Sequence, residues 1–86
     1  MKRYYIGGKQ YVPEESTELC SYSDTLEKST LYATDNGAFF IVREGFMNGT
    51  TAHVVSREDA FGYMDAHPDG IQTENYNRFF GEPERG

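Results

Sequence analysis

The sequence predicts an α+β fold, a small and mostly antiparallel β-sheet with helices on one face. Two observations predict the sheet: β-prone runs flank Gly7-Gly8, and longer β-prone runs flank Asp35-Asn36-Gly37. A third predicts the helices, because the last third of the chain has a capping signal followed by apolar residues at helical spacing. Hairpins followed by helices are typical of α+β proteins, in which the helices gather on one face of the sheet.

The first predicted element is a hairpin formed by residues 3–6 and 9–12. Gly7-Gly8 lies between the two runs. Both central residues of a tight primed turn need a positive φ, which glycine adopts without steric penalty. We therefore expect the chain to reverse at this pair of glycines.

A short helix is predicted over residues 13–21. Pro13-Glu14-Glu15 makes a favourable first turn, because proline needs no amide partner there and acids complement the helix dipole. Leu19 and Cys20 would then face inward. The polar segment 21–28 is predicted to be a loop.

The second predicted hairpin pairs residues 30–34 with residues 38–43. Its turn residues tolerate left-handed geometry, and its flanks are β-branched or aromatic. Residues 39–42 are apolar at every position, so neither face of that strand suits water. We expect this strand to be central, with a helix on one face and a second layer or a partner on the other.

The remaining elements are a loop over residues 45–49, a strand over residues 50–55 and two helices. Ser56 begins the first helix in a sequence that resembles a capping box, and Pro68 limits it to about His67. The second helix covers residues 73–80, with Thr73 as its cap and Gly81 at its end.

Length and composition predict one domain over residues 1–81 and a mobile tail over residues 82–86. The chain has 86 residues and no apolar run near the roughly 20 residues that a bilayer span needs. Gly7-Gly8 interrupts the start before a signal-peptide core can form. We therefore expect a cytoplasmic protein with no membrane contact, either a monomer or a homodimer.

The net charge of −6 lies almost entirely in the second half of the chain. Residues 1–43 carry six acids and five bases, whereas residues 44–86 carry eight acids and three bases. A field of this sign repels nucleic acid and attracts basic surfaces. The charge therefore predicts no direct binding of nucleic acid.

No group of residues has the spacing of a catalytic or metal site. His53 and His67 are the two histidines, and neither has the further spaced ligands that zinc requires. Cys20 is the single cysteine, and we expect it to be a buried small apolar residue. Glycine-rich phosphate loops and nucleophile elbows are also absent from the sequence. We predict that the protein is not an enzyme and needs no metal or cofactor.

The acids of the two late helices are the best candidates for a binding site. They are interleaved with aromatic residues, an arrangement typical of a surface that binds a basic groove, with carboxylates in place of phosphates and rings as anchors. The simpler alternative is an acidic surface that only keeps the protein soluble. The predicted partner-binding residues are Glu58, Asp59, Tyr63, Asp65, Asp69, Glu74 and Tyr76.

Three segments carry a resemblance to known proteins. They are Lys9-Gln10-Tyr11, the run Leu31 to Phe40 and Phe80-Gly81-Glu82. In this order they resemble short, largely uncharacterised bacterial proteins of phages and conjugative elements that share a Leu-Tyr-x-Thr-x-x-Gly-x-Phe-Phe run. The resemblance implies a mobile-element setting and no catalytic residues. Small acidic proteins in that setting are frequently inhibitors of host defence, including anti-CRISPR proteins, some of which mimic nucleic acid.

These observations together predict a non-enzymatic protein that binds a basic surface of a host nucleic-acid-processing complex, as a nucleic-acid mimic and anti-CRISPR inhibitor. The alternative is an accessory protein-binding module of unknown ligand. That module would use either the apolar strand 39–42 or the loop residues 46–47.

Overall fold

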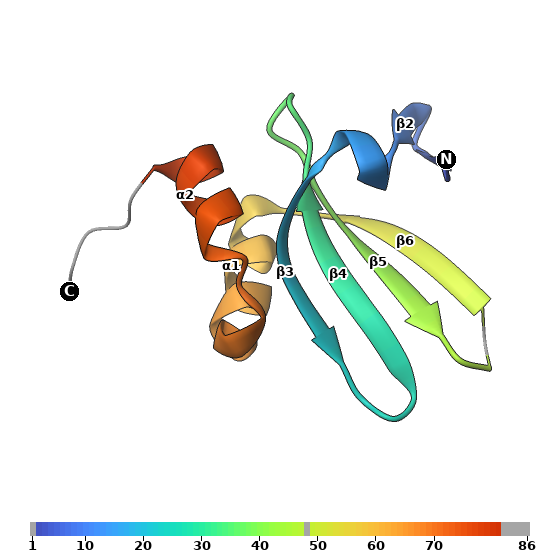
Figure 1. Ribbon diagram of the computed structural model, residues 1–86. Coiled ribbons are helices and arrows are strands. Elements are labelled where there is room, and N and C mark those ends of the chain that lie inside the picture. The colour runs from blue at the N-terminus through green and yellow to red at the C-terminus, as the bar shows by residue number, and fades with distance from the viewer. Residues whose placement is uncertain (1, 48, 82–86) are drawn as a thin grey trace.

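A four-stranded antiparallel sheet, a two-stranded hairpin and two α-helices make up the computed structural model, which describes residues 2–47 and 49–81 (Figure 1). The predicted α+β class is confirmed. The predicted tail, residues 82–86, lies outside the described residues. In chain order the elements are β1 (Tyr4–Ile6), β2 (Lys9–Tyr11), the 3₁₀ turn η1 (Pro13–Glu15), β3 (Thr17–Ser23), β4 (Glu27–Ala33), β5 (Phe39–Gly45), β6 (Gly49–Val55), α1 (Arg57–Ala66), the 3₁₀ turn η2 (Pro68–Gly70) and α2 (Thr73–Phe80).

Both predicted hairpins are present. β1 pairs with β2 around Gly7 and Gly8, whose φ angles of 58° and 79° are those that favour glycine. β4 pairs with β5 around the Asp-Asn-Gly turn, where the Gly37 N–H donates to the Thr34 carbonyl at 3.0 Å. β6 then follows β5 as the predicted strand, and the sheet order is β3-β4-β5-β6.

The strand β5 is buried on both faces, as its continuous apolar run predicts. Phe39 and Ile41 lie in the core beneath the two helices, with exposed fractions of 3% and 5%. Phe40 and Val42 lie on the opposite face, at 0% and 5%, against a smaller cluster that the β1–β2 hairpin covers. Residues 39–42 therefore present no surface to a partner, and the hypothesis that they form the binding surface is wrong.

The helix predicted over residues 13–21 is wrong beyond its first turn. Only η1 is helical, and the chain enters β3 at Thr17. β3 contains a bulge between Glu18 and Cys20, so Leu19 is an extra residue in its pairing with β4. The bulge places both Leu19 and Cys20 in the core beneath the helices, although consecutive strand residues normally face opposite sides.

The segment 21–28, predicted to be a loop, is mostly strand. β3 continues to Ser23 and β4 begins at Glu27, so the turn is short. Asp24 closes it, because its Oδ1 atom accepts hydrogen bonds from the N–H groups of Leu26 at 2.8 Å and Glu27 at 2.9 Å. These bonds, that from Glu27 foremost, lower the pKa of the Asp24 carboxyl group.

The two predicted helices are confirmed, with one correction at a cap. The Ser56 Oγ accepts a hydrogen bond from the Asp59 N–H at 3.0 Å, so Ser56 caps α1 as predicted. Thr73 is the first residue within α2 and does not cap it. The cap position belongs to Gln72, whose side chain makes no capping bond, and Gly81 ends the helix with a φ of 84°. Within the described residues, neither helix has the length and apolar character needed to cross a bilayer.

Cys20 is fully buried, as predicted, and its thiol donates to the His67 carbonyl at 3.3 Å. Burial raises the pKa of this thiol from its usual 9.0 to about 11. The unfolded chain therefore loses the thiol proton at a lower pH than the folded chain does. This contribution to stability is complete below about pH 9 and is lost as the pH rises through about 11.

We expect Cys20→Ala to reduce the loss of unfolding free energy between about pH 8 and pH 10.5, measured by urea denaturation. Burial also raises the pKa values of the Tyr32 and Tyr63 hydroxyls, so these two groups still lower the free energy of unfolding at high pH in this variant. An alkaline loss equal to that of the wild type would show that Cys20 does not contribute.

Candidate protein-binding site

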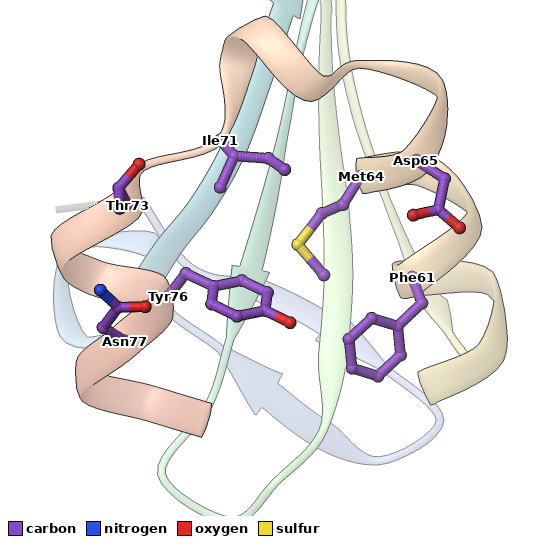
Figure 2. Close-up of a pocket in the computed structure, with 7 residues that line it drawn as sticks. All are labelled: Phe61, Met64, Asp65, Ile71, Thr73, Tyr76 and Asn77. Atoms are coloured by element: carbon purple, nitrogen blue, oxygen red, sulfur yellow. The ribbon is translucent and has the colours of Figure 1, made fainter. Parts of the chain in front are cut away.

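An open groove of about 300 Å³ lies between α1 and α2 (Figure 2). Phe61 and Met64 from α1, with Ile71 and Tyr76 from the other side, supply most of its apolar lining, and Figure 2 shows Met64 and Tyr76 pointing toward one another. A carboxylate, a hydroxyl and an amide complete it. The lining residues are Phe61, Met64, Asp65, Ile71, Thr73, Tyr76 and Asn77.

The spacing of residues in α1 and the attachment of α2 to β3 form this groove. Residues three and four apart lie on one side of a helix, so Phe61, Met64 and Asp65 face the same space. On the other side, the segment that leads into α2 is bonded to β3 where the Gln72 N–H donates to the Leu19 carbonyl at 2.8 Å. The groove is therefore held by elements fixed on the sheet.

An aromatic cluster closes one end of the groove around Phe80. Its ring centroid lies 5.2 Å from that of Phe61 and 4.8 Å from that of Tyr76. The guanidinium of Arg57 lies 5.3 Å from the Phe61 ring centroid and 5.4 Å from that of Phe80, a cation–π geometry. Arg57 therefore places a positive charge on these rings, next to the acids of the first turn of α1.

The five predicted carboxylates are all exposed, but they lie at different places on the helical layer. Asp65 lines the groove, and Glu74 follows Thr73, another lining residue, in the first turn of α2. Asp69 lies in η2, between the two helices. Asp65, Asp69 and Glu74 therefore lie at the end of the helix pair where η2 connects α1 to α2.

Glu58 and Asp59 lie in the first turn of α1, at its other end. Asp65 lies seven positions after Glu58, which corresponds to about 10 Å along the helix. The structure therefore brings Asp65 and Tyr76 to one groove, and it places Glu58 and Asp59 two turns away.

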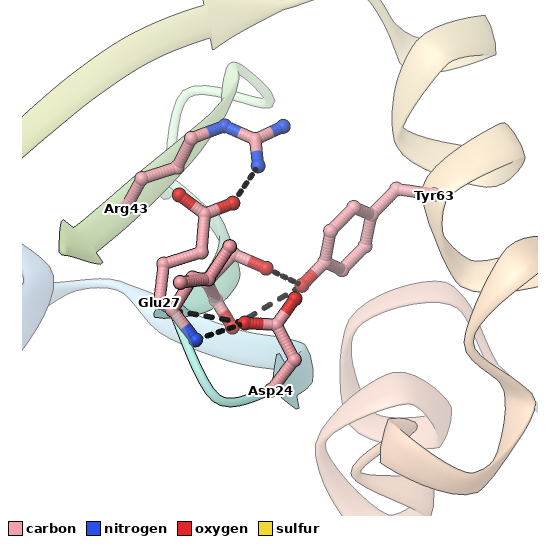
Figure 3. A network of polar contacts seen from close by, with 6 residues as sticks. Asp24, Glu27, Arg43 and Tyr63 are labelled. Carbon is pink, nitrogen blue, oxygen red and sulfur yellow. Dashed lines mark hydrogen bonds and ion pairs between the residues drawn. The ribbon is translucent and has the colours of Figure 1, made fainter. Parts of the chain in front are cut away.

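None of the five carboxylates forms an ion pair with another described side chain. Within residues 2–47 and 49–81 the ion pair found is Arg43 with Glu27, whose Nη1 and Oε1 atoms lie 3.0 Å apart (Figure 3). That pair joins β5 to β4 and is remote in sequence from the helices. The acids of the helical layer therefore keep their charge available for cations from outside.

Tyr63, predicted as a binding anchor, makes contacts inside the protein. Its hydroxyl lies 2.7 Å from the Ser29 Oγ and donates to the Ser29 carbonyl at 3.2 Å (Figure 3). Burial raises the pKa of this hydroxyl, and the bond with Ser29 offsets part of that rise. The contact joins α1 to β4.

We expect Tyr63→Phe to reduce the free energy of unfolding by about 1–2 kcal/mol, because it leaves the buried Ser29 hydroxyl without its partner. Urea denaturation monitored by circular dichroism measures the change. Tyr76→Phe is the matched control, since no hydrogen bond of its hydroxyl is found in the described residues, and its stability should stay within about 0.5 kcal/mol. Equal effects of the two substitutions would contradict a structural role for the Tyr63 hydroxyl.

In the part of the chain that the structure describes, neither histidine belongs to a cluster of side chains that could bind a metal ion. The His67 ring stacks on Tyr22 with centroids 4.2 Å apart and meets Tyr63 edge-on at 4.8 Å. His53 is exposed on β6. His67, at the end of α1, therefore packs against two aromatic rings.

A second exposed feature lies at the far end of the sheet, where two hairpin tips meet. The Phe46 N–H donates to the Leu26 carbonyl at 3.2 Å, which joins the β5–β6 loop to the β3–β4 turn. Leu26, Phe46 and Met47 are 76%, 69% and 94% exposed. Phe46 and Met47 were predicted as a possible contact site, whereas Leu26 was not, although an apolar side chain inside a polar turn is a signal of this kind.

Comparison of the chain with protein-family models, with curated proteins and with solved structures finds no match.

Proposed function

We propose that the chain is a non-enzymatic interaction protein that uses the groove between α1 and α2 to bind a basic surface of a nucleic-acid-processing protein. The observation that carries the proposal is an open apolar groove beside carboxylates that form no ion pair with any described side chain. An apolar groove favours an apolar side chain, and the acids select one that cations accompany. The occupant is accordingly an apolar side chain flanked by lysine or arginine.

The carboxylates and the groove contribute to binding in different ways. Exposed opposite charges gain little net affinity, about 0.2–1 kcal/mol per pair, but they speed association and make it depend on salt. Burial of apolar surface in the groove, at about 25 cal/mol per Å², supports the lifetime of the complex. The net charge of −6 favours the approach of a basic partner and disfavours nucleic acid itself.

We further propose that the partner is a CRISPR effector complex. The protein would inhibit this complex by occupying one of the complex's nucleic-acid-binding surfaces. Two features support it: the acidic helical layer and the resemblance to short mobile-element proteins. Carboxylates beside the groove would then take the place of phosphates.

The test is a competition experiment with a panel of purified CRISPR effector complexes, each bound to fluorescent target DNA. The protein is expected to lower the fluorescence anisotropy by displacing the DNA from at least one complex, and to do so less well as salt rises from about 50 to 300 mM. No displacement from any complex at about 100 µM protein would remove the anti-CRISPR proposal. Binding of another basic protein would remain to be tested separately.

The joined hairpin tips support a second candidate function, a protein-binding module that uses an apolar tip. Large apolar side chains exposed side by side commonly mark a contact site. For this function Phe46→Ser and Met47→Ser would weaken partner binding while reversal of the helical charges would leave it unchanged. If reversal of the helical charges weakens partner binding while Phe46→Ser and Met47→Ser leave it unchanged, the groove is supported as the binding site.

A further inference from the structure

The two outer strands of the four-stranded sheet differ in what lies along their free edges. β3 is covered by the chain's own later segment: the Gln72 N–H donates to the Leu19 carbonyl at 2.8 Å, and the Asn75 side-chain amide donates to the Glu18 carbonyl at 3.0 Å. Its bulge also interrupts the regular ladder. Covering and bulges are two of the ways in which proteins prevent an edge strand from pairing with another chain.

β6 carries no bulge, and no described segment is hydrogen-bonded to its free edge, although β1 packs close to it on the Phe40 side of the sheet. Its seven residues, Gly49–Val55, include no charged residue and no proline, and its pairing with β5 runs without a register shift. In the described ranges 2–47 and 49–81, β5 is its one strand partner, and Figure 1 shows β6 as the outermost strand of the four-stranded sheet. A regular, uncharged edge strand of this length is a template for another strand.

The hydrogen-bond pattern fixes which backbone groups point outward from β6. The Thr34 N–H donates to the Ala38 carbonyl at 2.8 Å, which makes this the first hydrogen-bonded pair of the β4–β5 hairpin. Such pairs alternate along an antiparallel ladder, so Ile41 directs its N–H and C=O toward β6 and bonds to His53. The residues of β6 whose backbone groups face the open edge are Thr50, Ala52 and Val54.

We propose that β6 pairs antiparallel with β6 of a second copy of this chain, with the two-fold axis at Ala52. In this register Ala52 bonds to its own counterpart, and Thr50 bonds to Val54 of the other copy. All three outward-facing residues then find partners, with about six hydrogen bonds in total. The two sheets become one continuous sheet, and the contact is closed because both copies use the same surface.

The local charge of this edge is compatible with a second copy as its occupant. Each chain carries a net charge of −6, so most surfaces of two copies repel one another. β6 is an uncharged strip on that acidic molecule, and pairing about Ala52 sets no like charges opposite each other. The small side chain at the axis also lets the two strands approach without a clash.

The size of the contact predicts a weak dimer. One pair of edge strands buries less than the roughly 1,200–2,000 Å² of a standard interface, so we expect a dissociation constant on the order of 10–100 µM. Light scattering after gel filtration should show a mass that rises from one chain toward two as the concentration increases through this range. A single-chain mass at every concentration up to about 1 mM would overturn the proposal.

Cysteine cross-linking tests the register. The Cα atoms of a hydrogen-bonded pair lie about 5.5 Å apart, within reach of a disulfide, so Ala52→Cys should form a covalent dimer under mild oxidation. Thr50→Cys is the matched control, because its new thiol would face Val54 of the other copy, and the two introduced thiols would lie about 13 Å apart along the strands. The native Cys20 is fully buried and does not compete.

The expected result is rapid cross-linking of Ala52→Cys and slow or absent cross-linking of Thr50→Cys. Equal rates for the two variants would overturn the register, and failure of both would overturn the pairing. Neither outcome bears on the groove, because the helices contribute no residue to this edge.

Discussion

Replacing Phe40 with alanine is expected to remove a large part of the protein's free energy of unfolding. Phe40 is the largest fully buried side chain, and its ring centroid lies 5.4 Å from that of Tyr11 and 5.2 Å from that of Tyr32. The substitution removes the central ring of the cluster between the sheet and the β1–β2 hairpin and leaves a cavity. Such substitutions cost about 3–5 kcal/mol, which is most of the stability of a small domain.

Phe46→Ala is the matched control, since Phe46 follows the same strand but is 69% exposed. Its stability should stay within about 0.5 kcal/mol of the wild type. Urea denaturation followed by circular dichroism gives both values. A Phe40→Ala variant with the wild-type midpoint would mean that the hairpin does not cover this face of the sheet.

Replacing Gly70 with alanine is expected to destabilise the protein by about 2–4 kcal/mol. A Cβ atom built on Gly70 falls inside contact distance of the Ser21 carbonyl oxygen and 2.9 Å from the Ser21 carbonyl carbon. Those atoms belong to the backbone of β3, so no side chain can rotate away. The turn η2 must move off β3, and this movement loosens Ile71, which bridges to Cys20.

Gly62→Ala separates the effect of this close approach from the general effect of losing a glycine. Gly62 lies in α1, and nothing lies within 4 Å of a Cβ atom built there. Alanine stabilises such a helical position by about 0.5–1 kcal/mol, so the midpoint of thermal unfolding should rise. If Gly70→Ala were as stable as Gly62→Ala, the close packing of η2 on β3 would be contradicted.

The elements that depend on local chemistry were predictable from the sequence. The Gly7-Gly8 pair and the Asp-Asn-Gly turn each define one hairpin, and Ser56 defines the start of α1, because each signal acts within a few residues. The burial of β5 followed from a run with no polar position. These features need no knowledge of the rest of the chain.

β3 was missed because its bulge breaks the pattern by which strands are identified. Leu19 and Cys20 are adjacent and both buried, which suggests a helix or an irregular segment more than an alternating strand. The favourable helical turn at Pro13 reinforced that error. Pairing with β4 and contact with Ile71 decide the conformation, and both partners are distant in sequence.

The negative charge of the candidate site could be predicted from the sequence, but the shape of the groove could not. The sequence shows the acids of the late helices, but the groove depends on how α2 is held against β3. For the same reason Tyr63 and Tyr76 were indistinguishable before their environments were known. One bonds to Ser29, and the other lines the groove.

The most direct test of the account compares two triple variants that carry the same charge. The groove variant has Asp65→Lys, Asp69→Lys and Glu74→Lys, and the control has Glu14→Lys, Glu15→Lys and Glu44→Lys, all at exposed positions. Each brings the net charge of −6 to neutrality. Immobilised wild type and variants are exposed to bacterial cytoplasmic extract at about 50 and 500 mM salt, and the captured proteins are quantified by mass spectrometry.

The account predicts that the wild type captures nucleic-acid-binding proteins at low salt, that the control retains most of this capture, and that the groove variant loses it by about 10-fold or more. Equal capture by the groove variant and the control would contradict it, because the position of the acids would then not matter.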